Sequence, residues 1–178
     1  MTKNTYTTWQ LRGRCFAWAI LAVSAISANG IASARTGELP RHDQIAPEFT
    51  ETQAAARVHL DQFFQAVMDE DGVAQMGAAV RVALPAAEGR HVLVWITPFA
   101  VDNGAFFGAP GDATLSTGPV ELITFERSQV VDWSFVGQDG LMYGNFATRL
   151  ILHTILPSQA AEIAALLSDN PAPEEWLQ

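Results

Sequence analysis

Cysteine and lysine are almost missing from this chain. The one cysteine, Cys15, lies ahead of an apolar block near the N-terminus, and the one lysine is Lys3. Beyond residue 15, the chain therefore offers no disulfide, no thiolate ligand for a metal and no cysteine nucleophile. Stability has to come from an apolar core, and 49% of the residues are hydrophobic.

Positive charge is also scarce. Ten basic residues stand against nineteen acidic ones, which gives a formal net charge of −9. A surface of this sign repels phosphate backbones and anionic lipid headgroups. We therefore expect no nucleic-acid partner.

Residues 1–34 have the three-part pattern of a secretory signal peptide. The basic residues of this segment are Lys3, Arg12 and Arg14, and it has no acidic residue. The apolar block, residues 16–28, is shorter than the roughly 20 residues that cross a bilayer. It is followed by Ala-Ser-Ala at 32–34, so we expect cleavage between Ala34 and Arg35. This predicts a periplasmic or secreted protein with no stable membrane span after cleavage.

The chain left after that cleavage has 144 residues and no cysteine. Its seven basic residues are all arginines, and with nineteen acidic residues its formal charge is −12. This length suits one domain with a sizeable core. We expect a flexible N-terminal arm at 35–49, a single α+β domain at 50–170 and a tail at 171–178.

Hydrophobic periodicity predicts the elements of that domain. A helix is expected to begin with Thr50 as its N-cap and to stop at Gly72, because its apolar residues recur at helical spacing. Runs of strand type follow at 78–84, 91–97, 105–107, 120–125 and 130–136. A C-terminal helix capped by Ser158 should end near Asn170, while 145–155 fit a helix or a strand.

Short connections between these strands favour antiparallel neighbours. The predicted fold class is α+β, with an N-terminal helix packed on an antiparallel, meander-like sheet and with C-terminal helical segments. Asp139-Gly140 between apolar runs indicates a hairpin. Strand alternation before that turn places Trp133 and Phe135 on one side of the sheet, and Asp132 and Ser134 on the other.

The candidates for chemistry are few. No G-x-S-x-G motif is present, and the histidines lie singly, so we expect no metal site and no cofactor. Asp132 could share a face with Glu121 or Glu126 as a carboxylate pair. It could instead form a charge-assisted pair with Arg149, either as a structural latch, which we favour, or as a catalytic pair.

Aromatic side chains offer a second kind of site. Trp95, Phe107 and Trp133 are expected to belong to the core, but any of them that is exposed would suit a ligand or peptide surface. The binding candidates are therefore these three residues.

Several motifs taken together resemble a bacterial family, the domain of unknown function 2314 family, which includes YegJ-like proteins. The segments are "AAARVHLDQFF" (54–64), "VRVAL" (80–84), "HVLVWI" (91–96), "FFGAP" (106–110), "VVDWSFV" (130–136) and "GNFATRLIL" (144–152). The chain departs from the family pattern at Arg90, which stands before His91 in place of an acidic residue, and in the loop before the third strand. The resemblance implies a fold and no particular activity.

Three functions remain open at this point. The favoured one is a non-catalytic module of the cell envelope that binds a protein or a small ligand. The second is a small hydrolase-like enzyme that uses Asp132 and Arg149. The third is an inhibitor or immunity-like protein, whose acidic surface would suit a basic target.

Overall fold

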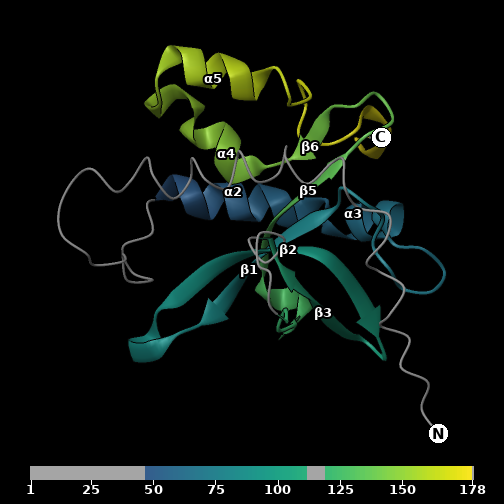
Figure 1. Cartoon of the computed structure of the whole chain (residues 1–178). Coiled ribbons are helices and arrows are strands. Elements are labelled where there is room, and N and C mark those ends of the chain that lie inside the picture. Colours follow the sequence, from purple (N-terminus) through teal and green to yellow (C-terminus); the bar gives the residue numbers. More distant parts are fainter. Residues whose placement is uncertain (1–46, 112–118, 178) are drawn as a thin grey trace, which may run out of the picture.

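The chain has an α+β fold in which helices pack on a six-stranded antiparallel sheet, as predicted (Figure 1). This description rests on a computed structural model and covers residues 47–111 and 119–177. The predicted signal peptide (1–34), most of the expected arm (35–46) and residues 112–118 lie outside this range.

Two helices precede the sheet. α2 spans Pro47–Val58 and α3 spans Leu60–Val67. The prediction of one helix capped by Thr50 and ending at Gly72 was wrong at both ends and in the middle. The helix begins at Pro47, a residue tolerated in the first turn because that position needs no amide hydrogen. The helix is interrupted at His59, whose φ and ψ are −105° and 13°.

The strands are β1 (Ala79–Pro85), β2 (His91–Asp102), β3 (Ala105–Pro110), β4 (Ile123–Phe125), β5 (Val130–Val136) and β6 (Met142–Gly144). Their order in the sheet is β4-β3-β2-β1-β5-β6, and all pairs are antiparallel. The first four strands form the predicted meander, whereas β5 joins β1. The expected hairpin between β2 and β3 is present, with Asn103 and Gly104 at its tip.

β2 is longer than the predicted strand because it continues beyond Pro98. Its pairing with β3 shifts between Ile96 and Phe99. A proline has no amide hydrogen to give to a ladder, so it fits at such an irregularity.

The sheet is strongly curled. Only residues 126–129 join β4 to β5, although three strands lie between them. In a flat sheet, four strand spacings would separate the two strands by about 19 Å. Five extended residues reach roughly 17 Å at most. The ends of β4 and β5 must therefore bend toward one another.

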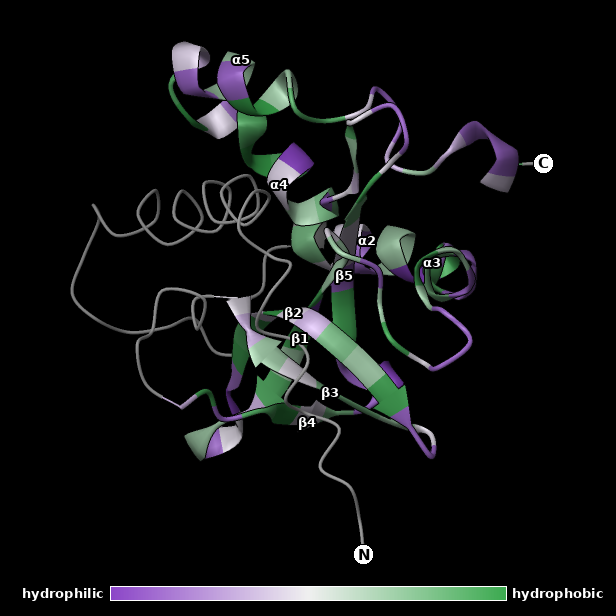
Figure 2. Cartoon of the chain, turned by 45° about the vertical axis from the view of Figure 1, so that its right-hand side comes forward, coloured by the Kyte–Doolittle hydropathy of each residue, from purple (hydrophilic) through white to green (hydrophobic). Residues whose placement is uncertain are grey.

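Aromatic side chains fill the space between the helices and the sheet. Phe63 of α3 stacks on Trp133 of β5, with ring centroids 5.0 Å apart, and the indole Nε1 of Trp133 donates to the carbonyl of Ala56 at 2.8 Å. Figure 2 shows the strands dominated by hydrophobic residues and the tip of the β2–β3 hairpin as hydrophilic.

The C-terminal part completes the core. The predicted hairpin joins β5 and β6, with Gly140 in its loop at a φ of +80°. The segment at 145–155, which the sequence left undecided, is helical: α4 spans Phe146–Ile151 and a 3-10 turn spans Leu152–Thr154. α5 (Pro157–Ala164) begins directly after Leu156, so Ser158 lies inside the helix and is not its N-cap, and the helix ends earlier than predicted.

The tail is part of the fold. A 3-10 turn at Glu174–Trp176 brings the Trp176 ring within 5.7 Å of Trp133 and 5.5 Å of Phe135, measured between ring centroids. Within the residues described, no helix combines the length and the apolar character needed to span a membrane.

Candidate functional site

Asp132 lies in the interior, with 2% of its surface exposed. Its Oδ1 accepts hydrogen bonds from the amides of Trp133 at 2.8 Å and Phe146 at 3.1 Å, and its Oδ2 accepts from the amide of Ala147 at 3.0 Å. Two of these donors are the first amides of α4, which have no partner inside the helix. The carboxylate therefore caps α4 from a neighbouring strand.

Burial raises the pKa of Asp132 to about 6, since the charged form loses its hydration. The bonds from the amides of Ala147, Trp133 and Phe146 oppose this rise, and so does the positive charge of Arg81. The carboxyl group of Asp132 thus accepts three hydrogen bonds at a buried position where its ionisation costs free energy.

Arg149, in the last turn of α4, is bonded to the backbone. Its Nε donates to the carbonyl of Gly144 at 2.8 Å, and its Nη1 donates to the carbonyl of Ser168 at 2.8 Å. Its Nη2 donates to the carbonyl of Met142 at 3.3 Å and to the hydroxyl of Ser168 at 3.2 Å. Burial lowers the pKa of Arg149, while the charges of Asp132 and Asp169 raise it.

The predicted direct pair of Asp132 with Arg149 is therefore wrong. Among the described residues, the ion pairs are Arg90–Glu88 and Arg127–Asp61. The two side chains still serve one purpose, because both fix α4 and the segments around it through backbone groups. The possible carboxylate pair is not formed either, since Glu121 and Glu126 flank β4, which is no neighbour of β5 in the sheet.

The sheet has an outer face, turned away from α2 and α3. Core residues Val80 and Ile96 are paired across β1 and β2, and so are the next positions, Arg81 and Trp95. Because side chains alternate along a strand, Arg81 and Trp95 point to the outer face. The same alternation places Leu93 there, with 40% of its surface exposed.

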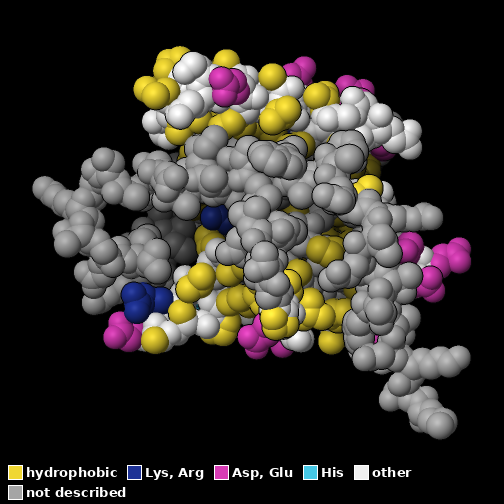
Figure 3. Space-filling model, in the orientation of Figure 1, with side chains coloured by type: hydrophobic (Ala, Val, Ile, Leu, Met, Phe, Trp, Pro, Cys, Tyr) yellow, Lys and Arg dark blue, Asp and Glu magenta, His cyan; other side chains and the backbone are white. Residues whose placement is uncertain are grey.

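The three aromatic candidates fall in different places. Trp133 is completely buried in the core and cannot line a surface. Trp95 and Phe107 are half-buried on the outer face, but the structure does not bring them together, since Phe107 pairs with Ala100, farther along β2. In Figure 3, hydrophobic side chains gather over the strands in the lower half of the molecule.

Arg81 is a site residue that the sequence reasoning missed. Its Nε is shielded from solvent and has no hydrogen-bond partner, and its Cζ lies 6.0 Å from the centroid of the Trp95 ring. Asp132 stands opposite it on β5. Burial lowers the pKa of Arg81, and the charge of Asp132 opposes that shift. A charged residue inside the alternating run "VRVAL" was the available signal.

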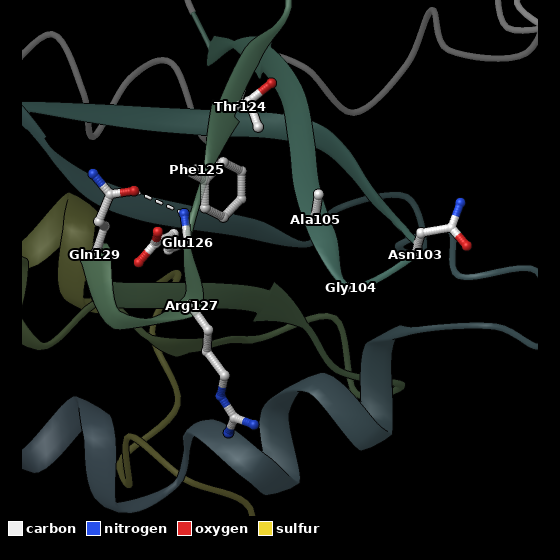
Figure 4. Close-up of a pocket in the computed structure, with 8 residues that line it drawn as sticks. All are labelled: Asn103, Gly104, Ala105, Thr124, Phe125, Glu126, Arg127 and Gln129. Atoms are coloured by element: carbon white, nitrogen blue, oxygen red, sulfur yellow. Dashed lines mark hydrogen bonds between the residues drawn. The ribbon is translucent and has the colours of Figure 1, made fainter.

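A shallow depression of about 570 Å³ lies between the β2–β3 tip and the segment that follows β4. Figure 4 shows the residues that line it. The Glu126 carboxylate accepts a hydrogen bond from the Ser128 hydroxyl at 3.1 Å. Gln129 Oε1 accepts from the amide of Glu126 at 2.7 Å. Arg127 pairs with Asp61 and covers the ring of Phe64. The charged side chains of the depression are therefore already engaged within the protein.

In the described part of the chain, no group of three or more His, Cys, Asp or Glu side chains is placed to hold a metal ion. No protein-family model matches the chain, and the searches of curated proteins and of solved structures gave no match to it. The resemblance to the domain of unknown function 2314 family thus stays a prediction from the motifs.

Proposed function

We propose that this protein is an exported, non-catalytic binding module of the bacterial cell envelope, and that the outer face of its sheet is the binding surface. The observation that carries the proposal is the contrast between two groups of side chains. Asp132 and Arg149 are committed to backbone groups, whereas Trp95 and Leu93 are presented on the outer face.

The N-terminal sequence supports the export part of the proposal. A basic start, a short apolar block and the Ala-Ser-Ala segment before Arg35 are the features that export and cleavage require. We expect the protein to be recovered from the envelope or medium with Arg35 as its first residue. N-terminal sequencing of protein from each cell fraction tests this. Recovery of the chain with Met1 intact from the cell interior would refute export.

The hydrolase-like alternative is less well supported. A carboxyl group with a pKa of about 6 can serve as a general acid. However, both oxygens of Asp132 already accept hydrogen bonds from backbone amides, and the side chain is buried. A substrate would have to displace structural bonds of α4.

The binding surface can be tested with matched variants. Leu93→Ser changes an exposed side chain on the outer face, and Met76→Ser changes one with 67% exposure in the loop before β1. Each purified variant is used to capture proteins and small molecules from an envelope extract, with quantitative mass spectrometry of the captured material. We expect the wild type and Met76→Ser to enrich the same partner, and Leu93→Ser to lose it. Equal recovery by all three would contradict a binding role of this face.

A further inference from the structure

Arg81 has more hydrogen-bonding capacity than its surroundings use. It lies on β1, which is flanked in the sheet by β2 and β5, where a charged residue is expensive to bury. An arginine has five N–H donors, and its Nε, shielded from water, has no partner. In natural structures such buried groups are almost always bonded.

The acidic residue opposite Arg81 on β5 does not satisfy its hydrogen-bond donors. Asp132 is opposite Arg81 in the pairing of β1 with β5, but its two oxygens are held by the amides of Trp133, Phe146 and Ala147. In the described residues, no ion pair between Arg81 and Asp132 is formed. The carboxylate lowers the electrostatic cost of the guanidinium without occupying its donors.

Several other neighbours of Arg81 are apolar, although Ser134 is buried opposite Ala79 on β5. The Trp95 ring lies beside it, Ala79 and Ala83 flank it on β1, and Leu93 stands opposite Ala83 on β2. Ala79 is completely buried and Ala83 is small, so Trp95 and Leu93 are the contacts that remain for an apolar group. A ligand that used both the Arg81 guanidinium and this apolar surface would carry an acidic group joined to a ring or to an aliphatic chain.

We infer that Arg81 binds the carboxylate of an organic acid that carries an apolar group, which packs on Trp95 and Leu93. This inference rests on the proposed binding function and names the ligand class for that surface. A guanidinium binds a carboxylate through two parallel hydrogen bonds. A single negative charge fits better than two, because Asp132 and the acidic surface repel a dianion.

The acid could be a free small molecule or the C-terminus of a peptide, and the test separates these sources. The probes are 3-phenylpropionate and a short peptide ending in Ala-Phe, each compared with its own amide, and phenyl phosphate as a dianion. Binding to the chain expressed from Met1 and purified from the producing cells is measured by calorimetry at neutral pH. We expect at least one acid to bind about tenfold more tightly than its amide, since charge-assisted bonds are lost in the amide.

Variants then assign the effect to Arg81. Arg81→Met should remove the difference between the acid and its amide, whereas Arg90→Met, which changes an arginine in the β1–β2 connection, should keep it. The comparison of acid with amide in the wild type needs no variant, so a misfolded Arg81→Met protein does not spoil the test.

Two results would overturn the inference. One is that neither acid binds more tightly than its amide, and the other is that phenyl phosphate binds more tightly than both acids. Either result leaves the proposed function standing if the partner captured from the envelope still depends on Leu93. If that dependence is also lost, both proposals fall.

Discussion

Asp132 and Arg149 show how single polar residues can organise an apolar region. Asn145, at the N-cap of α4, has a φ of +55° and its side chain makes no capping bond. Asp132 supplies that bond from fourteen residues away, and Arg149 binds the carbonyls on the other side of the same segment. Both residues are therefore expected to govern stability, and each leads to a measurable prediction.

The raised pKa of Asp132 predicts a specific pH dependence. Because its pKa is about 6 when folded and 3.8 in its ordinary state, the native protein binds a proton more tightly between these values. The stability that Asp132 contributes is therefore highest below pH 4 and is lost as pH rises through 6, by about 3 kcal/mol in total once the pH is well above 6. Asp132→Asn removes this titration. Urea unfolding at several pH values should show that the free energy of unfolding of the wild type rises relative to that of the variant as pH falls from 6 to 4. A constant difference would argue against the raised pKa.

At neutral pH, Arg149→Met should lower the free energy of unfolding by roughly 2–4 kcal/mol, since it leaves buried carbonyls without donors. Arg90→Met is the matched control. It breaks an ion pair with an exposed glutamate, and we expect it to change stability by less than about 0.5 kcal/mol. Urea unfolding of both variants checks this, and similar losses in the two proteins would count against the structural role of Arg149.

At the scale of elements, the strands and hairpins were readable from the sequence, while the helix ends were not. Period-two alternation and the turns at Asn103-Gly104 and Asp139-Gly140 are local signals, and the structure has strands and hairpins there. The start of α4, in contrast, depends on Asp132, a residue of a neighbouring strand that local sequence does not reveal as its cap. The candidate site shows the same limit, because the neighbours of Asp132 and Arg81 follow from strand order.

Gly144, the last residue of β6, permits the turn from the sheet into α4. Its φ is +75°, and a Cβ at this position would lie 2.0 Å from the carbonyl oxygen of Trp133. Gly144→Ala should therefore cost about 4 kcal/mol or more. Gly140 has a similar φ of +80°, but a Cβ at this position would meet no other atom within 4 Å, so Gly140→Ala should cost only about 1–2 kcal/mol. Thermal unfolding of the two variants separates the effect of a steric clash from that of backbone strain alone. Equal losses of stability in the two variants would show that the close approach to Trp133 is unimportant.

At the scale of the molecule, the C-terminal tail closes the aromatic core. Trp176 contacts Trp133 and Phe135, which also contact Phe63 of α3. The core is thus assembled from segments more than 110 residues apart.

Trp176→Ala should lower the free energy of unfolding by about 2–3 kcal/mol through the loss of ring contacts and buried area. Leu177→Ala removes an adjacent side chain that is 57% exposed, and it should have little effect. Equilibrium unfolding in urea measures both. If Trp176→Ala is as stable as the wild type, the tail does not contribute to the core.

The position of β1 between β2 and β5 has a consequence for the order in which the protein can form during synthesis. β2 leaves the ribosome soon after β1, but β5 follows about fifty residues later, and Trp176, whose ring closes the core, is made later still. Long-range pairing of this kind is slow to form. The nascent chain consequently holds an incomplete sheet with exposed hydrophobic side chains until β5 and the segment that carries Trp176 have been made.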